Sequence, residues 1–339
     1  MFKISIIIPC YNASQYIDRC LTSIVKQTIG VNSLQIICVD DASTDNTWHC
    51  LQQWEQRYPN NIILVHLDEN SRQGTARNIA IQYVEASWIT FIDADDWIEI
   101  DFCEIMHSFA TGLECDIVRC NMKRDSSKSL TYFQNRETDI PNQYLIIDSI
   151  DKRKNFMVNH MLGHTACDKL VRTSLLTDNQ ILFADHLAYE EIPWHSLLHA
   201  YASKVFILGS SLYHYYTNPN STTSVQNADY HVDILTSSLF AWQTWKDHDL
   251  FLNYKNELEY NLIFYGYLFF LKTIFSSSNP SYSFYLMARE IILDHIPDYS
   301  LNPYILRPMS QADQLLINFL DQRMDSMQFE QLFYMPETQ

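Results

Sequence analysis

The stretch W-I-T-F-I-D-A-D-D-W, residues 88–97, joins an apolar run to a cluster of acidic residues. The run 88–92 predicts a buried strand that ends at Asp93. Residues two apart in an extended backbone point to the same side, so the carboxylates of Asp93 and Asp95 face one direction. A hard divalent cation could bridge them, because Mg²⁺ and Mn²⁺ prefer carboxylate and phosphate oxygens. The alternative is a solvated acidic loop that begins the helix after Trp97.

Three strand and helix units precede this stretch. Runs rich in β-branched residues predict strands at 3–8, 35–39 and 62–67, and apolar residues at helical spacing predict helices at 13–27, 45–57 and 75–86. Strands that alternate with helices predict an α/β fold with a parallel sheet. Ligands of such sheets bind beyond the carboxyl ends of the strands, where residues 9–12, 40–43 and 93–96 fall.

The later part of the chain has a different pattern. We predict a polar loop or hairpin at 123–138, helices at 156–176 and 190–202, a strand at 204–208 and a turn at 218–220. From about residue 229 the sequence shows only helical periodicity, broken near 276–280 and at Pro297 and Pro303. This pattern predicts one domain over 1–225, divided near residue 100, and a helical C-terminal module over 226–339.

The composition bounds the class of partner. The formal net charge is -17, which repels nucleic acid and anionic lipid over most of the surface, so we expect no nucleic-acid partner. An anionic substrate needs a bound cation or a few placed Arg and Lys residues.

The cysteines and the apolar segments indicate the compartment. All eight cysteines lie in the first half without a C-x-x-C pair, which predicts free buried thiols and a reducing cytoplasm. The opening M-F-K-I-S-I-I-I-P predicts a first strand rather than a signal peptide. The apolar segment 262–275 is too short to cross a bilayer.

Polar residues near the other strand ends are candidates for ligand contacts. Asp40 and Asp41 follow the second strand, and one of them is suited to accept a hydrogen bond from a base N–H or a ribose hydroxyl. The alternative is a role in starting the next helix. Arg77 lies in G-T-A-R-N, residues 74–78, and its guanidinium could reach a phosphate or orient the acidic cluster; the alternative is an ordinary surface arginine.

Seven short motifs in this order resemble the family 2 glycosyltransferases. They are I-I-I-P-C-Y-N-A at 6–13, V-D-D-A-S-T-D-N-T at 39–47, E-N-S-R-Q-G-T-A-R-N at 69–78, F-I-D-A-D-D-W at 91–97, C-D-K-L at 167–170, Y-E-E-I-P-W at 189–194 and L-Y-H-Y at 212–215. The resemblance covers residues 1 to about 225. Each motif alone is weak, and seven in the correct order are specific.

The resemblance implies a GT-A fold, a Rossmann-like mixed sheet flanked by helices, and an inverting, metal-dependent glycosyltransferase. It implies a nucleotide-sugar and metal half over 1–100 and an acceptor half over 101–225. The residues expected to bind the nucleotide sugar are Pro9, Tyr11, Asn12, Asp40, Asn70, Gly74, Arg77, Asp93 and Ala94. The residues expected to hold Mn²⁺ or Mg²⁺ are Asp93, Asp95, Asp96 and His214, although a lone His among tyrosines is more often a hydrogen-bonded structural residue.

The resemblance also assigns the catalytic step. The family usually has Glu-Asp where this chain has Glu190 and Glu191, and we expect Glu191 to be the base. Asp168 and Lys169 match the motif on the acceptor side. Tyr216 stands where the family tends to have Arg, so a contact to the diphosphate is absent or supplied elsewhere.

The expected reaction moves a sugar from a nucleotide sugar, with a UDP-sugar favoured, to a glycan or lipid-linked acceptor in surface polysaccharide synthesis. We expect a cytoplasmic protein with at most peripheral association at the inner face of the membrane. The aromatic helical module is expected to pack on the domain or to join copies of the chain. The main alternative is a catalytically inactive module that binds nucleotide sugars.

Two other classes fit less well. A phosphoacceptor receiver domain expects a shorter unit and a later Lys. A nucleotidyltransferase expects a Gly-rich loop, whereas residues 9–14 contain no Gly.

Overall fold

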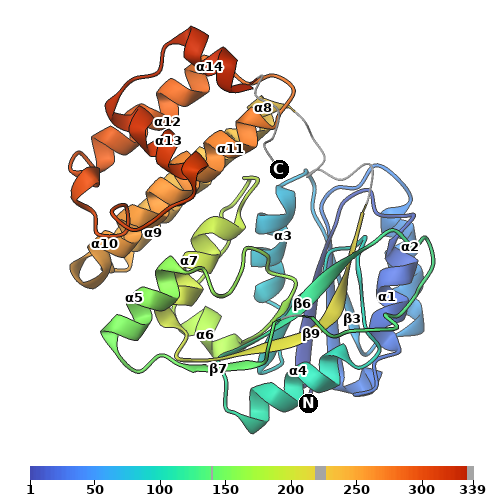
Figure 1. Cartoon of the computed structure of the whole chain (residues 1–339). Coiled ribbons are helices and arrows are strands. Elements are labelled where there is room, and N and C mark those ends of the chain that lie inside the picture. The colour runs from blue at the N-terminus through green and yellow to red at the C-terminus, as the bar shows by residue number, and fades with distance from the viewer. Residues whose placement is uncertain (139, 218–226, 334–339) are drawn as a thin grey trace.

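The computed structural model describes residues 1–138, 140–217 and 227–333. Figure 1 shows a twisted sheet with helices on both faces and a group of C-terminal helices beside one end of it. The predicted turn at 218–220 lies outside the described residues.

Four parallel strands form the first half of the sheet. They are β1 (Ile4–Cys10), β2 (Leu34–Asp40), β3 (Ile62–His66) and β4 (Trp88–Phe91), in the spatial order β3-β2-β1-β4. Every residue of β1 and β2 is buried, as expected for strands covered on both faces. Helices α1 (Ile17–Val25), α2 (Thr47–Arg57) and α3 (Arg72–Ile81) connect them. These strands and helices confirm the predicted β-α-β units, with small differences at the ends.

The second half makes the sheet mixed. Strand β8 (Lys169–Arg172) pairs antiparallel with β4. Beyond β8 the sheet continues, in spatial order, with β6 (Ile117–Asp125), β9 (Lys204–Tyr216) and β5 (Trp97–Ile98). Strand β7 (Gln143–Ile146) also pairs with β9. Helices α4 (Phe102–Gly112), α5 (Ile150–Val158), α6 (Thr173–Asp178) and α7 (Glu191–Tyr201) connect and cover these strands. The expectation of a mixed sheet flanked by helices is confirmed.

One local prediction was wrong here, and a second was correct but too short. The predicted helix at 156–176 contains the central strand β8, because pairing with β4 and β6 overrides the local pattern. The predicted strand at 204–208 continues to Tyr216, past Gly209, where the carbonyl oxygen of Ile140 would lie 2.1 Å from an added Cβ. A side chain is therefore excluded at this point of β9.

All described elements from Ala228 onward are helical. They are α8 (Ala228–His231), α9 (Asp233–Asp247), α10 (Phe251–Ile263), the π-helix η3 (Phe264–Phe269), α11 (Phe270–Phe275), α12 (Tyr282–His295), η4 (Tyr299–Leu301), α13 (Gln311–Asp321) and α14 (Ser326–Phe333). Many of the aromatic residues pack in the interior, including Trp245, Tyr267 and Phe270. The boundary predicted at residue 225 stays a prediction.

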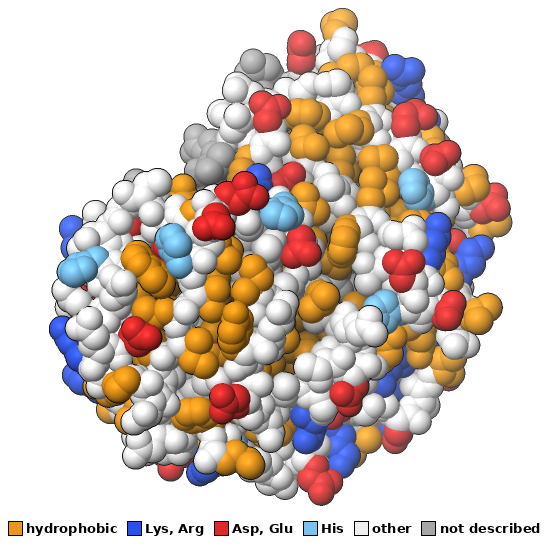
Figure 2. Space-filling view, turned by 180° about the vertical axis from the view of Figure 1, so that it is seen from behind, with side chains coloured by type: hydrophobic (Ala, Val, Ile, Leu, Met, Phe, Trp, Pro, Cys, Tyr) orange, Lys and Arg blue, Asp and Glu red, His pale blue; other side chains and the backbone are white. Residues whose placement is uncertain are grey.

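The surface of these helices retains apolar side chains. Leu252, Leu301 and Leu306 are exposed, and Figure 2 shows hydrophobic side chains spread over the upper part of the rear face. Among the described helices, none is both long enough and apolar enough to cross a bilayer. The predicted association of copies through this module stays a prediction.

The eight cysteines carry free thiols. All are buried except Cys50, which is partly exposed. The prediction of free buried thiols is confirmed for seven of the eight.

Candidate functional site

A cavity of about 670 Å³ opens at the carboxyl ends of the parallel strands. Seven of the predicted site residues line it: Pro9, Tyr11, Asn12, Asp93, Ala94, Asp95 and Glu191. They come from the end of β1 and the loop after it, the loop after β4 and the start of α7. The cavity therefore lies where ligands of open α/β sheets bind.

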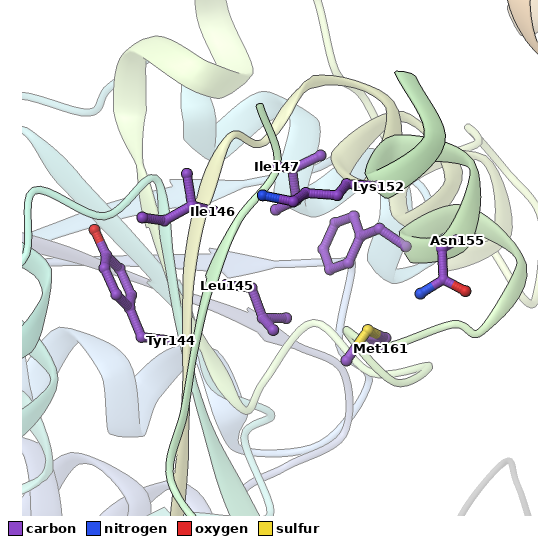
Figure 3. Close-up of a pocket in the computed structure, with 8 residues that line it drawn as sticks. Tyr144, Leu145, Ile146, Ile147, Lys152, Asn155 and Met161 are labelled. Atoms are coloured by element: carbon purple, nitrogen blue, oxygen red, sulfur yellow. The ribbon is translucent and has the colours of Figure 1, made fainter. Parts of the chain in front are cut away.

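A second cavity of about 380 Å³ lies between β7 and α5 (Figure 3). Its walls are mainly the apolar side chains of Leu145, Ile147, Phe156 and Met161, and Lys152 is the charged residue among those that line it. This cavity has neither a carboxylate nor an imidazole in its lining. We therefore place the candidate active site in the larger cavity.

Asp93 and Asp95 both line the larger cavity. They lie in a turn after β4 rather than in the extended backbone that the prediction assumed, because the N–H of Asp96 donates to the carbonyl oxygen of Asp93 at 3.0 Å. The side chain of Asp93 is 32% exposed, and its Oδ1 accepts a hydrogen bond from Nη2 of Arg77 at 2.8 Å. The backbone oxygen of Asp95 accepts one from Nη2 of Arg19 at 2.6 Å. These contacts hold the loop after β4 in place, and both residues line the cavity.

The two carboxylates fit a cation that is completed by a substrate. Residues 1–138, 140–217 and 227–333 contain no group of three or more His, Cys, Asp or Glu side chains that could hold a metal ion by itself. Mg²⁺ and related ions are commonly held by one or two protein carboxylates together with phosphate and water oxygens. Asp93 and Asp95 provide such a pair, but not a complete protein cage.

Glu191 is the first residue of α7 and faces the same cavity. Its Oε1 accepts a hydrogen bond from the backbone N–H of Ala166 at 3.2 Å. Burial and the neighbouring charge of Glu190 raise the pKa of Glu191 to about 8. A carboxylate with a pKa near the working pH is well matched to the removal of a proton from a hydroxyl.

Glu190 lies behind the cavity wall and is completely buried. Its Oε1 accepts hydrogen bonds from Nη1 of Arg77 at 2.5 Å and from Nε2 of Gln73 at 2.7 Å. Burial raises the pKa of Glu190 as well. Glu190 thus links α3 to the start of α7, and Arg77 joins it to Asp93.

The loop after β1 is tied to the loop after β2. Asn12 adopts a left-handed backbone conformation with φ of 49°. Its Oδ1 accepts a hydrogen bond from the backbone N–H of Thr44 at 2.8 Å, and its own N–H donates to Oγ of Ser43 at 3.0 Å. Tyr11, which is 49% exposed, stands beside it in the cavity wall.

Of the two adjacent aspartates at the end of β2 and just after it, Asp41 lines the cavity and Asp40 does not, and the predicted donor contact of Asp40 stays a prediction. Asp40 is fully buried in β2, and its Oδ2 lies 2.8 Å from Nδ1 of His66. Oδ1 of Asp41 accepts a hydrogen bond from the backbone N–H of Ser71 at 2.6 Å.

Asn70, Gly74 and Arg77 also lie outside the residues that line the cavity. Asn70 is exposed, and its Nδ2 donates to the backbone oxygen of Asp41 at 3.4 Å. Gly74 packs against the segment before α7, because an added Cβ would lie 2.5 Å from the oxygen of Ala184. Their predicted contacts with the donor stay a prediction.

The predicted metal ligands Asp96 and His214 are both engaged elsewhere. Oδ2 of Asp96 accepts a hydrogen bond from the hydroxyl of Tyr213 at 2.6 Å, and Oδ1 accepts one from the N–H of Tyr216 at 2.7 Å. Nδ1 of His214 lies 2.9 Å from Oδ2 of Asp125, and Nε2 lies 2.8 Å from Oε1 of Glu99. Both residues are buried, and their predicted binding of the metal stays a prediction.

Asp168 and Lys169 form a buried ion pair rather than a surface for the acceptor. Nζ of Lys169 lies 2.5 Å from Oδ1 of Asp168, and Nε of Arg119 lies 2.8 Å from Oδ2. Lys169 also donates to the backbone oxygen of Thr165, which lines the cavity. Burial lowers the pKa of Lys169. The predicted direct contact of the two residues with the acceptor stays a prediction.

Sequence reasoning missed several residues of the lining. Gln73, Thr165, Tyr16 and Tyr215 contribute to it, as does Tyr216, which was singled out only as a departure from the family pattern. Gln73 lies within the motif at 69–78 and Thr165 lies two residues before the motif at 167–170, so membership of a motif or proximity to one was the available signal.

The comparisons with known proteins point to one family. A family model described as Glycosyl transferase family 2 matches residues 5–176. The poly(ribitol-phosphate) beta-glucosyltransferase of Bacillus spizizenii is 31% identical over 214 residues, which are 63% of this chain and 32% of that protein. The putative glycosyltransferase EpsH of Bacillus subtilis is 30% identical over 262 residues, 76% of this chain and 71% of that protein.

A solved structure shares the fold. The crystal structure of S. aureus TarS residues 1–349 in complex with UDP-GlcNAc aligns with a TM-score of 0.55 at 19% sequence identity. The alignment covers 94% of this chain and 79% of that one. By contrast, the chain spans 32% of the length of the Bacillus spizizenii relative.

Proposed function

This chain belongs to the glycosyl transferase family 2, and we propose that it transfers a sugar from a UDP-sugar to a hydroxyl of a glycan or lipid-linked acceptor. The observation that carries the proposal is one cavity whose walls include Asp93, Asp95 and Glu191. Two carboxylates suited to a cation and a third with a raised pKa are the groups that an inverting sugar transfer requires.

The donor is proposed to lie along the loops after β1 and β2. Tyr11 offers an aromatic face for a base, and the second carboxylate oxygen of Asp41 can accept from a base N–H or a ribose hydroxyl. The crystallised complex of TarS with UDP-GlcNAc supports a UDP-sugar as donor.

Asp93 and Asp95 would hold Mn²⁺ or Mg²⁺ together with oxygens of the diphosphate. Such an ion supplies Lewis-acid stabilisation of the negative charge on the departing diphosphate. It also offsets the repulsion between an anionic donor and a chain with a net charge of -17.

Glu191 is proposed as the general base. Its carboxylate takes the proton of an acceptor hydroxyl while that oxygen forms a bond to the anomeric carbon. The bond from the anomeric carbon to the diphosphate breaks on the opposite face, the diphosphate leaves with the electron pair, and the configuration inverts. Ala166 orients the carboxylate through its backbone N–H.

A neutral, hydroxyl-bearing acceptor fits the described lining. Its titratable side chains other than cysteine and tyrosine are acidic, namely Asp41, Asp93, Asp95 and Glu191, and tyrosines make up much of the remaining wall. Tyrosine rings and hydroxyls suit the apolar faces and hydroxyls of a sugar. We propose a role in surface polysaccharide synthesis at the inner face of the membrane.

The proposal is tested by thermal-shift screening of UDP-, GDP-, CDP- and dTDP-sugars with and without Mn²⁺, followed by assays of donor hydrolysis. We expect a UDP-sugar to give the largest Mn²⁺-dependent shift and to be hydrolysed slowly. The Glu191→Gln variant should bind the same donor but hydrolyse it at least about 100-fold more slowly. Donor binding without any hydrolysis or transfer by the unaltered chain would support an inactive binding module instead.

A further inference from the structure

The backbone just before Glu190 and Glu191 adopts an unfavourable conformation. His186 and Tyr189 have φ of 57° and 58°, in the left-handed region that L-residues rarely adopt. Such conformations persist where surrounding contacts hold them. The contacts that hold this segment therefore decide where the first residues of α7 stand.

Helix α9 forms hydrogen bonds with both the backbone N–H and the backbone carbonyl of Ala188 in this segment. The N–H of Ala188 donates to Oδ2 of Asp233 at 3.0 Å, and the carbonyl oxygen of Ala188 accepts from Oγ of Ser237 at 2.9 Å. Asp233 and Ser237 are one helical turn apart, so they lie on the same face of α9. The hydroxyl of Tyr189 adds a third contact at 2.6 Å from Nδ1 of His231 in α8.

Asp233 also reaches the helix that carries Arg77. Its Oδ2 accepts a hydrogen bond from Nη1 of Arg72, the first residue of α3, at 2.6 Å. Arg72 has φ of 66°, so this residue too is held in the left-handed region. One carboxylate oxygen thus joins α9 to both segments that place the Arg77 and Glu190 pair.

The packing between these segments leaves little freedom. An added Cβ at Gly74 would lie 2.8 Å from Cβ of Glu190, so α3 and the start of α7 are in close contact. A shift of Ala188 is therefore transmitted to Glu190 and Glu191 rather than absorbed by a gap.

We propose that Asp233, assisted by Ser237, is a positioning residue that sets the place of the Glu191 carboxylate for the transfer reaction. The inference rests on the proposed function, in which Glu191 is the base. It gives the C-terminal helices a part in turnover without any contact to donor or acceptor.

The variants Asp233→Ala, Asp233→Asn and Ser237→Ala test this role in the full chain, with the exposed Asp247→Ala in α9 as matched control. The assay measures kcat and KM for Mn²⁺-dependent hydrolysis of UDP-N-acetylglucosamine, UDP-glucose, UDP-galactose and GDP-mannose, using the one hydrolysed fastest. The donor Kd, the Tm and the pH profile of kcat are recorded beside them.

We expect Asp233→Ala to lower kcat by about 10- to 100-fold, because small displacements of catalytic groups have effects of this size. The donor Kd should change by less than about twofold, because the loops after β1 and β4 are untouched. The kcat values of Asp233→Asn and Ser237→Ala should lie between those of Asp233→Ala and the unaltered chain. The midpoint of the pH profile should move down in Asp233→Ala as water reaches Glu191.

Unchanged kcat in a folded Asp233→Ala variant overturns the inference. A loss of kcat that comes with an equal loss of donor affinity and an unmoved pH midpoint also overturns it, because that outcome indicates only a structural role. If Glu191→Gln abolishes hydrolysis while all three variants are normal, the inference fails and the proposed function stands. If none of the four donors is hydrolysed by the unaltered chain, the proposed function fails and the inference with it.

Discussion

Nη1 of Arg77 lies 2.5 Å from Oε1 of Glu190, and both side chains are completely buried. The same guanidinium donates from Nη2 to Asp93, so one cation ties the proposed metal-binding loop to the proposed catalytic pair. An ionised arginine is tolerated at this depth because two carboxylates compensate it. The pair therefore links the two halves of the site through the interior rather than through the cavity.

Removal of Arg77 should destabilise the fold strongly. The Arg77→Met variant leaves the buried carboxylate of Glu190 without its cation, and we expect the free energy of unfolding to fall by about 3–5 kcal/mol. Adding Glu190→Gln to this variant should recover part of the loss. Urea denaturation measures both, with the exposed Arg57→Met as the control that stays within about 1 kcal/mol. Equal stability of the Arg77 and Arg57 variants would contradict the role of the buried pair.

Donor hydrolysis should rise with pH. Only the deprotonated carboxylate of Glu191 can take a proton, and burial together with Glu190 raises its pKa to about 8. We therefore expect kcat to increase with pH with a midpoint near pH 8, and to level off about one pH unit above that midpoint. Glu190→Gln removes the neighbouring charge, so the midpoint should move to lower pH. A midpoint that is the same in both proteins would argue against Glu191 as the titrating group.

The raised pKa of Glu191 also predicts how the stability of the fold depends on pH. The folded-state pKa of Glu191 is raised, so its stabilising contribution is present below the unfolded value of about 4.3 and is lost as pH rises through about 8. Glu191→Gln, which cannot ionise, should therefore gain stability relative to the unaltered chain between about pH 5 and pH 9. Urea denaturation at both pH values measures this difference. A stability difference that is independent of pH would show that Glu191 has an ordinary pKa.

Much of the fold follows from local patterns. Strands β1, β2 and β4 are apolar runs that end at polar residues, and hydrophobic burial on both faces requires little else. Strand β8 is different, because its first residue is the charged Lys169. The ammonium group of Lys169 is buried and donates hydrogen bonds to the carboxylate of Asp168 and to the backbone oxygen of Thr165. Its pairing with β4 and β6 is a long-range property that the local pattern does not contain.

The site was predictable to a similar extent. Asp93 and Asp95 both reach the cavity, but through a turn in which the N–H of Asp96 donates to the carbonyl oxygen of Asp93 at 3.0 Å, and not through the alternation of an extended strand. Which of Asp40 and Asp41 faces the cavity depends on where β2 ends, and one residue changes the side to which a carboxylate points. The two residues that donate hydrogen bonds to the carboxylate of Asp96, Tyr213 and Tyr216, lie at the end of β9, more than a hundred residues away. The sequence around Asp96 therefore does not predict them.

Metal-dependent donor binding should separate Asp95 from Asp96. Asp95→Asn removes a carboxylate at the cavity, so we expect the gain in UDP affinity on addition of Mn²⁺ to fall at least about tenfold. Asp96→Asn should instead lower the Tm, because its oxygens accept from Tyr213 and Tyr216. Calorimetric titration of UDP with Mn²⁺ or with EDTA measures the first effect. The same Mn²⁺-dependent gain in Asp95→Asn and the unaltered chain would exclude Asp95 as a ligand.

His214 should prove structural rather than metal-binding. Its imidazole stacks between Trp97 and Phe133 and faces the carboxylates of Glu99 and Asp125 through its two nitrogens. His214→Leu leaves the buried Glu99 with one partner fewer, so the free energy of unfolding should fall by about 1–3 kcal/mol. The exposed His49→Leu is the control and should stay within about 0.5 kcal/mol. Equilibrium dialysis in the presence of UDP should find the same number of Mn²⁺ ions bound per chain in both variants. If a fully stable His214→Leu protein bound one Mn²⁺ ion fewer than the control, His214 would be a metal ligand.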